Sequence, residues 1–275
     1  MNKHKQQSHG FSILIIIALL AVVAVVGFAG YSVMSKKGDK QDSQQMSSNQ
    51  NQQKQANQQG QNGQINRTDE TPVKLQNLGL SSFDNIIYDP FAVAEFASQG
   101  KKGFYVFGDP LPGGRTNPNF EYSSVKKDAK VVAAIDGVIV HINEQHENGQ
   151  DDFEVFLQTS DKSVWMIGYD HLINVAVKQG DRVKVGDFLG NPGVQNNGLA
   201  RFEIQVNKEM STTEHICPTT LLADSIKDQM FEGLKTVMNT WEDETGLELY
   251  DLAAQNPIGC KNKTTLTPAE AEGRQ

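Results

Sequence analysis

Four histidines in the second half of the chain are the side chains best suited to hold a metal ion. They are His141, His146, His171 and His215, and each has an acidic residue close by in the sequence. Zinc-binding histidines and cysteines recur at short, fixed spacings, and these four residues do not. A metal site assembled from them is an alternative, but isolated histidines are more often buried or surface residues. The sequence therefore predicts no metal site and no other cofactor.

Cys217 and Cys260 are the two cysteines of the chain, and they flank a predicted helix. In an oxidising compartment such a pair is typical of a disulfide. Closing a loop of about 44 residues would stabilise the fold by roughly 4 kcal/mol in the chain-entropy model. Two unrelated buried thiols are the alternative, so the predicted disulfide depends on export of the chain.

The segments that must position these residues are mostly β-like. Short runs rich in β-branched and aromatic residues, bounded by turn-forming residues, cover 131–142, 152–159, 163–172 and 200–206. In residues 221–241 apolar side chains instead recur every three or four positions, and Gly246 follows as a stop signal. The sequence predicts a mainly β domain with one C-terminal amphipathic helix packed on its sheet.

Residues 11–34 are an uncharged apolar segment, and a helix of 24 residues is long enough to span a bilayer. Signal-peptide cores are shorter, so we expect a retained anchor in the lipid bilayer. Lysines lie on both sides of the segment and leave its direction nearly balanced. Because the cysteines look oxidised, we expect a single-pass protein of the cell membrane, with a cytoplasmic N-terminus and an extracytoplasmic C-terminal domain.

Amino-acid composition distinguishes the segment after the apolar span from the body of the chain. Residues 41–66 contain 16 Gln or Asn among 26, and such a polar stretch is typical of a disordered tether. The expected order is a basic leader (1–10), a transmembrane helix (11–34), a tether (35–72), a β domain (73–216), a helical appendix (217–262) and a tail (263–275).

The net charge of −8 is the sum of two unlike regions. The first 72 residues hold 7 Lys/Arg and 4 Asp/Glu, or +3, and the rest hold 18 and 29, or −11. An acidic body repels phosphates, so we expect no nucleic-acid partner.

The N-terminus resembles a type IV prepilin, because a short polar leader ends at Gly10 and Phe11 begins an apolar helix. The resemblance implies cleavage between Gly10 and Phe11 and a pilin-like role in surface assembly. Pilins have a glutamate where this chain has Ile15, and their helix continues beyond the membrane. A plain signal anchor is therefore the alternative.

The body resembles the lysostaphin/LytM-type zinc peptidases, metallopeptidase family 23. The resemblance covers about residues 104–222. It rests on AAIDGVIV (133–140), the YDHL block (169–172), VKQGDRVKVGDFLG (177–190) and RFEIQV (201–206), with an upstream echo at 125–137. It implies an antiparallel β-sheet core with a duplicated hybrid motif.

Members of this family bind zinc through the His and Asp of an HxxxD motif and the second His of an HxH motif. By motif position, Asn117 replaces that first His, Glu121 replaces the Asp, and Arg201 replaces the last His. Leu199 replaces the other His of the HxH motif, whereas His171 is retained. An arginine is always protonated and offers no lone pair. The resemblance thus implies a degenerate member without zinc ligands and without a catalytic residue.

We expect a pseudo-peptidase that binds cell-wall peptidoglycan, through peptide or glycan, or a partner murein hydrolase. The candidate groove residues are Asn117, Glu121, Tyr169, His171, Leu199 and Arg201. An ion pair between Arg201 and Glu121 is expected to fill the zinc cavity, and a separation above about 6 Å would contradict it. The alternatives are an active zinc endopeptidase of peptidoglycan and a pilin-like surface-assembly subunit.

Overall fold

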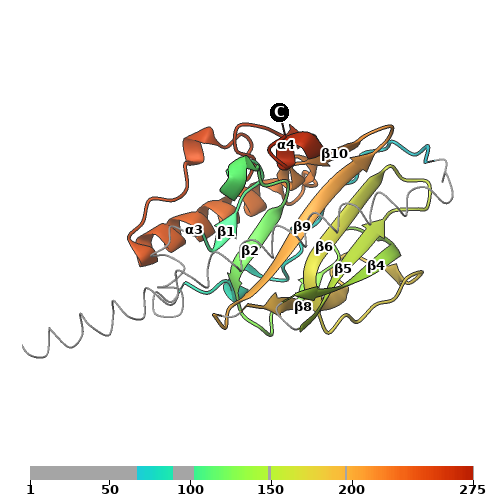
Figure 1. The fold of residues 1–275 in the computed structure, drawn as a ribbon, viewed down its shortest axis with the longest axis horizontal. Coiled ribbons are helices and arrows are strands. Elements are labelled where there is room, and N and C mark those ends of the chain that lie inside the picture. Colours follow the sequence, from blue (N-terminus) through green and yellow to red (C-terminus); the bar gives the residue numbers. More distant parts are fainter. Residues whose placement is uncertain (1–66, 89–101, 148–149, 196, 275) are drawn as a thin grey trace, which may run out of the picture. The chain divides into compact units, whose positions relative to one another are not determined.

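The computed structural model describes residues 67–88, 102–147, 150–195 and 197–274 (Figure 1). The expected leader, the apolar span, most of the tether and the Gly10–Phe11 junction lie outside these residues. Within the described part, no helix combines the length and the apolar character needed to cross a membrane. All of the described residues belong to one compact unit within 65–275.

The described unit is built mainly from antiparallel strands, which confirms the predicted fold class. Its strands are β1 (Phe104–Tyr105), β2 (Phe120–Val125), β3 (Val131–Val132), β4 (Gly137–Glu147), β5 (Gln150–Gln158), β6 (Trp165–Ile173), β7 (Arg182–Val183), β8 (Phe188–Val194), β9 (Ala200–Glu209), β10 (Thr213–Ile216) and β11 (Thr265–Leu266). Its helices are α3 (Lys227–Thr245) and α4 (Pro268–Ala271), with short 3-10 turns η1 (Phe83–Asn85), η2 (Pro112–Gly114), η3 (Pro218–Leu221) and η4 (Leu252–Ala254).

The main sheet has the order β1-β2-β9-β8-β6-β5-β4-β7. Strand β9 also pairs directly with β6 and with β10. Glu203 in β9 is the register partner both of Glu121 in β2 and of Asp170 in β6. Three strands that are far apart in sequence therefore lie side by side, as Figure 1 shows for β2, β9 and β6.

Strand alternation gives this sheet one apolar face and one polar face. The rings of Tyr122 and Phe202 stack on the apolar face, with centroids 4.6 Å apart, and both side chains are fully buried. Glu121 and Glu203 directly adjoin them in sequence and point to the opposite face. The core thus lies on one side of β2 and β9, and their charged residues gather on the other.

Helix α3 begins later than the periodicity of residues 221–241 predicts. Leu75 donates its backbone N–H to Leu221 O at 2.8 Å and accepts from Ala223 N at 2.9 Å. This pairing holds residues 221–223 extended, so the helix forms only after them. It ends as predicted at Gly246, whose φ of +68° is left-handed and whose N–H donates to Glu242 O.

The expected strand over residues 131–142 is divided into β3 and β4. Between them, Ala133 exchanges backbone hydrogen bonds with Asp187 and Gly186, and Gln76 donates to Ala134 O. These residues are therefore bonded to loops instead of to one continuous strand partner.

The disulfide between Cys217 and Cys260 is present, as predicted. It joins the end of β10 to the segment that follows α3. The expected tail is also attached to the domain, because β11 pairs with β10 and the Thr267 hydroxyl caps α4. At the other end, contacts with the body begin before residue 73, since Asp69 forms a bridge with Ser163.

Candidate functional site

Charged side chains gather on the polar face of β2, β5, β6 and β9. We refer to seven of these residues as the charged cluster: Glu121, Asp152, Glu154, Asp170, His171, Arg201 and Glu203. All of them are buried or half-buried. The cluster unites five carboxylates with one guanidinium and one imidazole, so negative charge is in excess.

His171 lies between carboxylates of three strands. Its Nδ1 is 2.8 Å from Asp152 Oδ2, and its Nε2 is 3.4 Å from Glu203 Oε1 and 3.8 Å from Asp170 Oδ2. Both ring nitrogens therefore face acidic groups, and the imidazole connects β5, β6 and β9.

A local break in β6 allows Asp170 and His171, which are adjacent in sequence, to join the same cluster. His171 has a φ of +59°, in the left-handed region that side chains rarely adopt. The register between β5 and β6 also shifts between Phe153 and Val155. Such an irregularity turns a side chain that regular alternation would send to the other face.

Arg201 provides the guanidinium of the cluster. Its Nη1 is 4.0 Å from Glu121 Oε1, and its Nη2 is 3.4 Å from His171 Nδ1. The predicted pair of Arg201 and Glu121 is thereby confirmed, since the separation is inside the 6 Å limit.

Burial and crowding shift the proton affinities of the carboxylates upward. Burial, and then the charge of Glu203, raise the pKa of Glu121 above its usual value. Burial, followed by Asp170, raises the pKa of Glu154 well above the usual range. Burial also raises the pKa of Asp170 to about 6. Each of these three carboxyl groups is therefore harder to ionise in the cluster than in water.

The pKa values of His171 and Glu203 shift in the directions expected of an ion pair. Burial, together with Arg201, would lower the pKa of His171, but Asp170, Asp152 and Glu203 outweigh them and raise this pKa well above its usual value. Burial would raise the pKa of Glu203, but the hydrogen bond and charge of His171 lower it. The neighbouring carboxylates therefore favour the protonated form of His171.

Asn117 lies outside the charged cluster, in a loop before β2. Its Nδ2 donates to Val106 O at 3.1 Å and to Asn119 O at 3.0 Å, and 2% of the residue is exposed. Asn119 takes its place in the cluster, because its amide donates to Glu203 Oε2. Sequence position alone could not show which of these two side chains turns toward the sheet.

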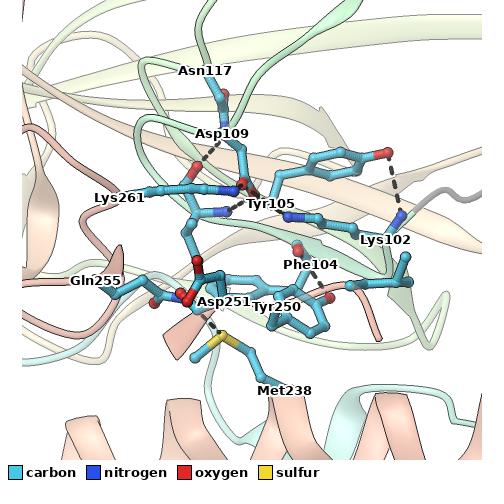
Figure 2. A network of polar contacts seen from close by, with 12 residues as sticks. Lys102, Phe104, Tyr105, Asp109, Asn117, Met238, Tyr250, Asp251, Gln255 and Lys261 are labelled. Carbon is cyan, nitrogen blue, oxygen red and sulfur yellow. Dashed lines mark hydrogen bonds and ion pairs between the residues drawn. The ribbon is translucent and has the colours of Figure 1, made fainter. Parts of the chain in front are cut away.

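The C-terminal segment fixes the loop that carries Asn117. Figure 2 shows the ammonium groups of Lys102 and Lys261 pointing at the Asp109 carboxylate from two sides. Lys102 Nζ is 2.8 Å from Asp109 Oδ1, and Lys261 Nζ is 3.4 Å from the same atom. Asp109 O accepts the backbone N–H of Asn117 at 2.8 Å. These contacts hold Asn117 in the loop.

Tyr169 and Leu199 do not line the polar face, contrary to expectation. Tyr169 is fully buried, and its hydroxyl accepts the backbone N–H of Ala134 at 2.7 Å. It precedes Asp170 in β6, so alternation sends its ring to the core. Leu199 is 3% exposed and packs within the core. Of the six expected residues, the structure brings together Glu121, His171 and Arg201.

Sequence analysis missed four carboxylates of the cluster: Asp152, Glu154, Asp170 and Glu203. A usable signal was present, because Glu154 and Glu203 each stand between two apolar residues of a strand. An acidic residue at an alternate position of a strand with a buried face points to the opposite, polar face.

The antiparallel sheet, with its core on one face and its charged cluster on the other, defines a lysostaphin-type β domain. The model of Peptidase family M23 matches residues 122–213. This segment is therefore similar to the M23 peptidase family over about a third of the chain. The match begins one residue after Glu121, so it includes His171 and Arg201 but not the loop with Asn117.

Several solved structures are similar to part of the chain. The catalytic domain of the prophage-encoded M23 protein EnpA from Enterococcus faecalis is 20% identical, with a TM-score of 0.32, over 42% of this chain and 88% of that one. The catalytic domain of lysostaphin from Staphylococcus simulans is 24% identical, with a TM-score of 0.31, over 42% and 87%. The SpoIIQ-SpoIIIAH pore-forming complex gives 15% identity, a TM-score of 0.38, and 58% and 98% coverage. Among curated proteins, none matches the chain.

The residues that the sequence resemblance assigns to the zinc-ligand positions do not fit a zinc ion. Asn117 uses its amide to bond two backbone carbonyls of its own loop. Arg201 places a protonated guanidinium beside Glu121, and a guanidinium repels a metal cation and has no lone pair to donate. Of the three positions, Glu121 alone has a side chain able to ligate zinc in the usual way.

Proposed function

We propose that the chain is a membrane-anchored, extracytoplasmic pseudo-peptidase that binds cell-wall peptide or glycan without cutting it. The observation that carries this proposal is Arg201 in the charged cluster, at a position where the M23 motif has a zinc ligand. A family zinc at an open site would activate a water molecule. Arg201 cannot support that chemistry, whereas a guanidinium is well suited to binding.

The partly exposed members of the cluster supply the binding groups. The side chains of Arg201 and Glu203 are each 15% exposed, and that of Asp170 is 21% exposed. Guanidinium N–H groups donate to carbonyls and carboxylates, and carboxylates accept from amide N–H and hydroxyl groups. These complementary groups occur in peptides and glycans.

The proposed location follows from two features of the chain. The apolar segment 11–34 is long enough to hold the protein in a bilayer. The disulfide between Cys217 and Cys260 is of the kind that persists in oxidising compartments. Together they favour a domain outside the cytoplasm, at the cell wall.

A partner murein hydrolase is the second candidate ligand. Residues 73–275 carry 18 Lys/Arg and 29 Asp/Glu, so the body has a negative field that suits a basic partner. If a hydrolase is the ligand, the domain would position or activate that enzyme instead of binding peptidoglycan itself.

The test uses the full chain, purified in detergent, with insoluble peptidoglycan sacculi. We expect the protein to sediment with sacculi and to release no soluble fragments. Arg201→Met should reduce co-sedimentation, whereas Lys184→Met should not, because it removes a cation that is 83% exposed and that pairs with Asp136 outside the cluster. Release of fragments by the wild-type protein would overturn the proposal. If the protein neither binds nor dissolves sacculi, a murein hydrolase is the expected partner, and a pull-down with that enzyme would test it.

A further inference from the structure

Three members of the charged cluster lie close enough together to hold a metal ion. Asp152, Asp170 and His171 each offer one ligand atom, and the three atoms lie within 4.8 Å of one another. Asp152 is 6% exposed and His171 is 5% exposed. A set of two carboxylates and one imidazole, withdrawn from solvent, is a donor combination that zinc-type ions accept.

Asp152 supplies an independent sign that a ligand belongs here. Its Oδ2 is bonded to His171 Nδ1 at 2.8 Å, so the carboxylate points into the cluster. Its Oδ1 is buried and has no hydrogen-bond partner in the described part of the chain. A buried carboxylate oxygen without a donor is costly, and native structures rarely leave one without a water molecule or an ion.

The charge of the cluster favours a cation. Five carboxylates face Arg201 and His171. Arg201 Nη1 is 4.0 Å from Glu121 Oε1, and its Nη2 is 3.4 Å from His171 Nδ1, so the guanidinium offsets part of the negative charge. A divalent ion would bring the remaining carboxylates closer to balance. Without one, the like charges of Glu154, Asp170 and Glu203 repel one another in a partly buried space.

Neutral donors already hold the Asp170 carboxylate in place. Asp170 Oδ1 accepts the backbone N–H of His171 at 2.8 Å and the Gln145 amide at 3.4 Å. Its Oδ2 is left facing the imidazole at 3.8 Å. Ligand carboxylates in metal sites are oriented by such outer hydrogen bonds.

We propose that Asp152, Asp170 and His171 form a binding site for one divalent transition-metal ion, with Zn²⁺ as the natural probe. The site is distinct from the ligand positions of the M23 motif, which here hold Asn117, Glu121 and Arg201. It goes beyond the proposed function and does not depend on it, since a pseudo-peptidase can bind a metal for stability or ligand capture.

A second group in the described residues provides a matched control. Glu144, His146 and Asp151 also place their ligand atoms within 4.8 Å of one another, but all three are exposed. His146 and Asp151 already pair at 2.9 Å. Asp151 directly precedes Asp152, so Asp151→Asn and Asp152→Asn differ by one position and separate the two groups.

The experiment strips the full chain with a chelator, adds Zn²⁺, and measures retained metal by elemental analysis and affinity by calorimetry. We expect one Zn²⁺ per chain, and a rise in the unfolding temperature on binding. Asp152→Asn should weaken binding by about tenfold or more, and Asp151→Asn should leave it unchanged. Asp170→Asn, in a different strand, gives the same test if Asp152→Asn fails to fold.

The outcomes decide between clear alternatives. Absence of retained Zn²⁺ in the wild-type protein, or equal loss in Asp151→Asn, would overturn the site. Zinc binding that is lost in Asp152→Asn, together with intact sacculi, supports both the site and the pseudo-peptidase. Zinc binding together with release of peptidoglycan fragments would support the site and overturn the proposed function.

Discussion

Arg201 in β9 and Glu121 in β2 face each other across neighbouring strands, with 4.0 Å between Nη1 and Oε1. The resemblance to the M23 motifs assigns both to metal-ligand positions, and here a cation and an anion of the protein itself face each other. The pair is not isolated, because Glu203 and His171 lie beside it. We therefore expect the two side chains to contribute unequally to the free energy of unfolding.

The first prediction concerns this inequality. Arg201→Met removes a cation from a cluster with excess negative charge and should lower the free energy of unfolding by about 2 kcal/mol, less than for a fully buried pair. Glu121→Gln removes one of the crowded carboxylates and should change it by less than about 1 kcal/mol. Urea unfolding at pH 7 measures both. Equal losses would show that the two charges act as a simple pair.

The second prediction concerns restoration of the family motif. The triple variant Asn117→His, Glu121→Asp, Arg201→His has the three zinc-ligand residue types of the M23 motifs, although Leu199 still replaces the other His of the HxH motif. We expect no hydrolysis of sacculi, because position 117 faces Val106 and Asn119 in its loop instead of the cluster. The measurement is release of soluble fragments with added Zn²⁺, with lysostaphin as positive control. Turnover by the variant would show that the loop rearranges.

The third prediction tests the attachment of that loop. Asp109 is 1% exposed and binds both Lys102 and Lys261. Asp109→Asn leaves two ammonium groups without their counterion and should cost about 3 kcal/mol of unfolding free energy. Lys261→Met should cost about 1 kcal/mol, since Lys102 remains at the shorter distance. Chemical denaturation measures both, and a larger loss in Lys261→Met would contradict the assignment.

The fold was predictable because its signals are local. Alternating strands and the 3.6-residue periodicity of α3 can be read from neighbouring residues, and Gly246 marks the end of the helix. The helix start was not predictable, because it depends on Leu75 pairing with residues 221–223 from far away in sequence. Distant pairing overrides local periodicity there.

The site was predictable only in part, for the same reason. Motif positions identified Glu121, His171 and Arg201, and the structure unites them. Asn119 contacts the cluster in place of Asn117, because hydrogen bonds to Val106 and Asp109 hold Asn117 in its loop. No motif encodes these bonds. The carboxylates of β5 and β6 join the cluster because of sheet order and of the left-handed backbone at His171.

The fourth prediction concerns the disulfide. Cys217 and Cys260 are 43 residues apart in sequence and both are fully buried. Replacing both by serine should lower the free energy of unfolding by about 3–4 kcal/mol, because the cross-link restricts the unfolded chain. Denaturation of the double variant, compared with oxidised wild type, measures the loss. A difference below about 1 kcal/mol would show that the bond adds little to the packed segment.

The fifth prediction concerns acid, through His215 in β10. Its Nδ1 is 2.9 Å from Asn207 Oδ1, its Nε2 is buried without a partner in the described residues, and burial lowers its pKa to about 4. Between about pH 4 and 6.5 the unfolded chain binds a proton here and the folded chain does not. Stability from this group is therefore present above pH 6.5 and is lost as the pH falls toward 4, by about 3 kcal/mol in total.

His215→Gln should remove that loss, so its unfolding free energy should fall less steeply with acid than that of the wild type, by about 1.4 kcal/mol per pH unit. His146→Gln is the matched control, because the His146 side chain is 73% exposed. Urea unfolding at several pH values between 4 and 7 gives the slopes. Because the carboxylates of the charged cluster titrate in every variant, their contribution cancels in the comparison. Parallel slopes for the wild type and His215→Gln would mean that His215 is protonated in the folded domain.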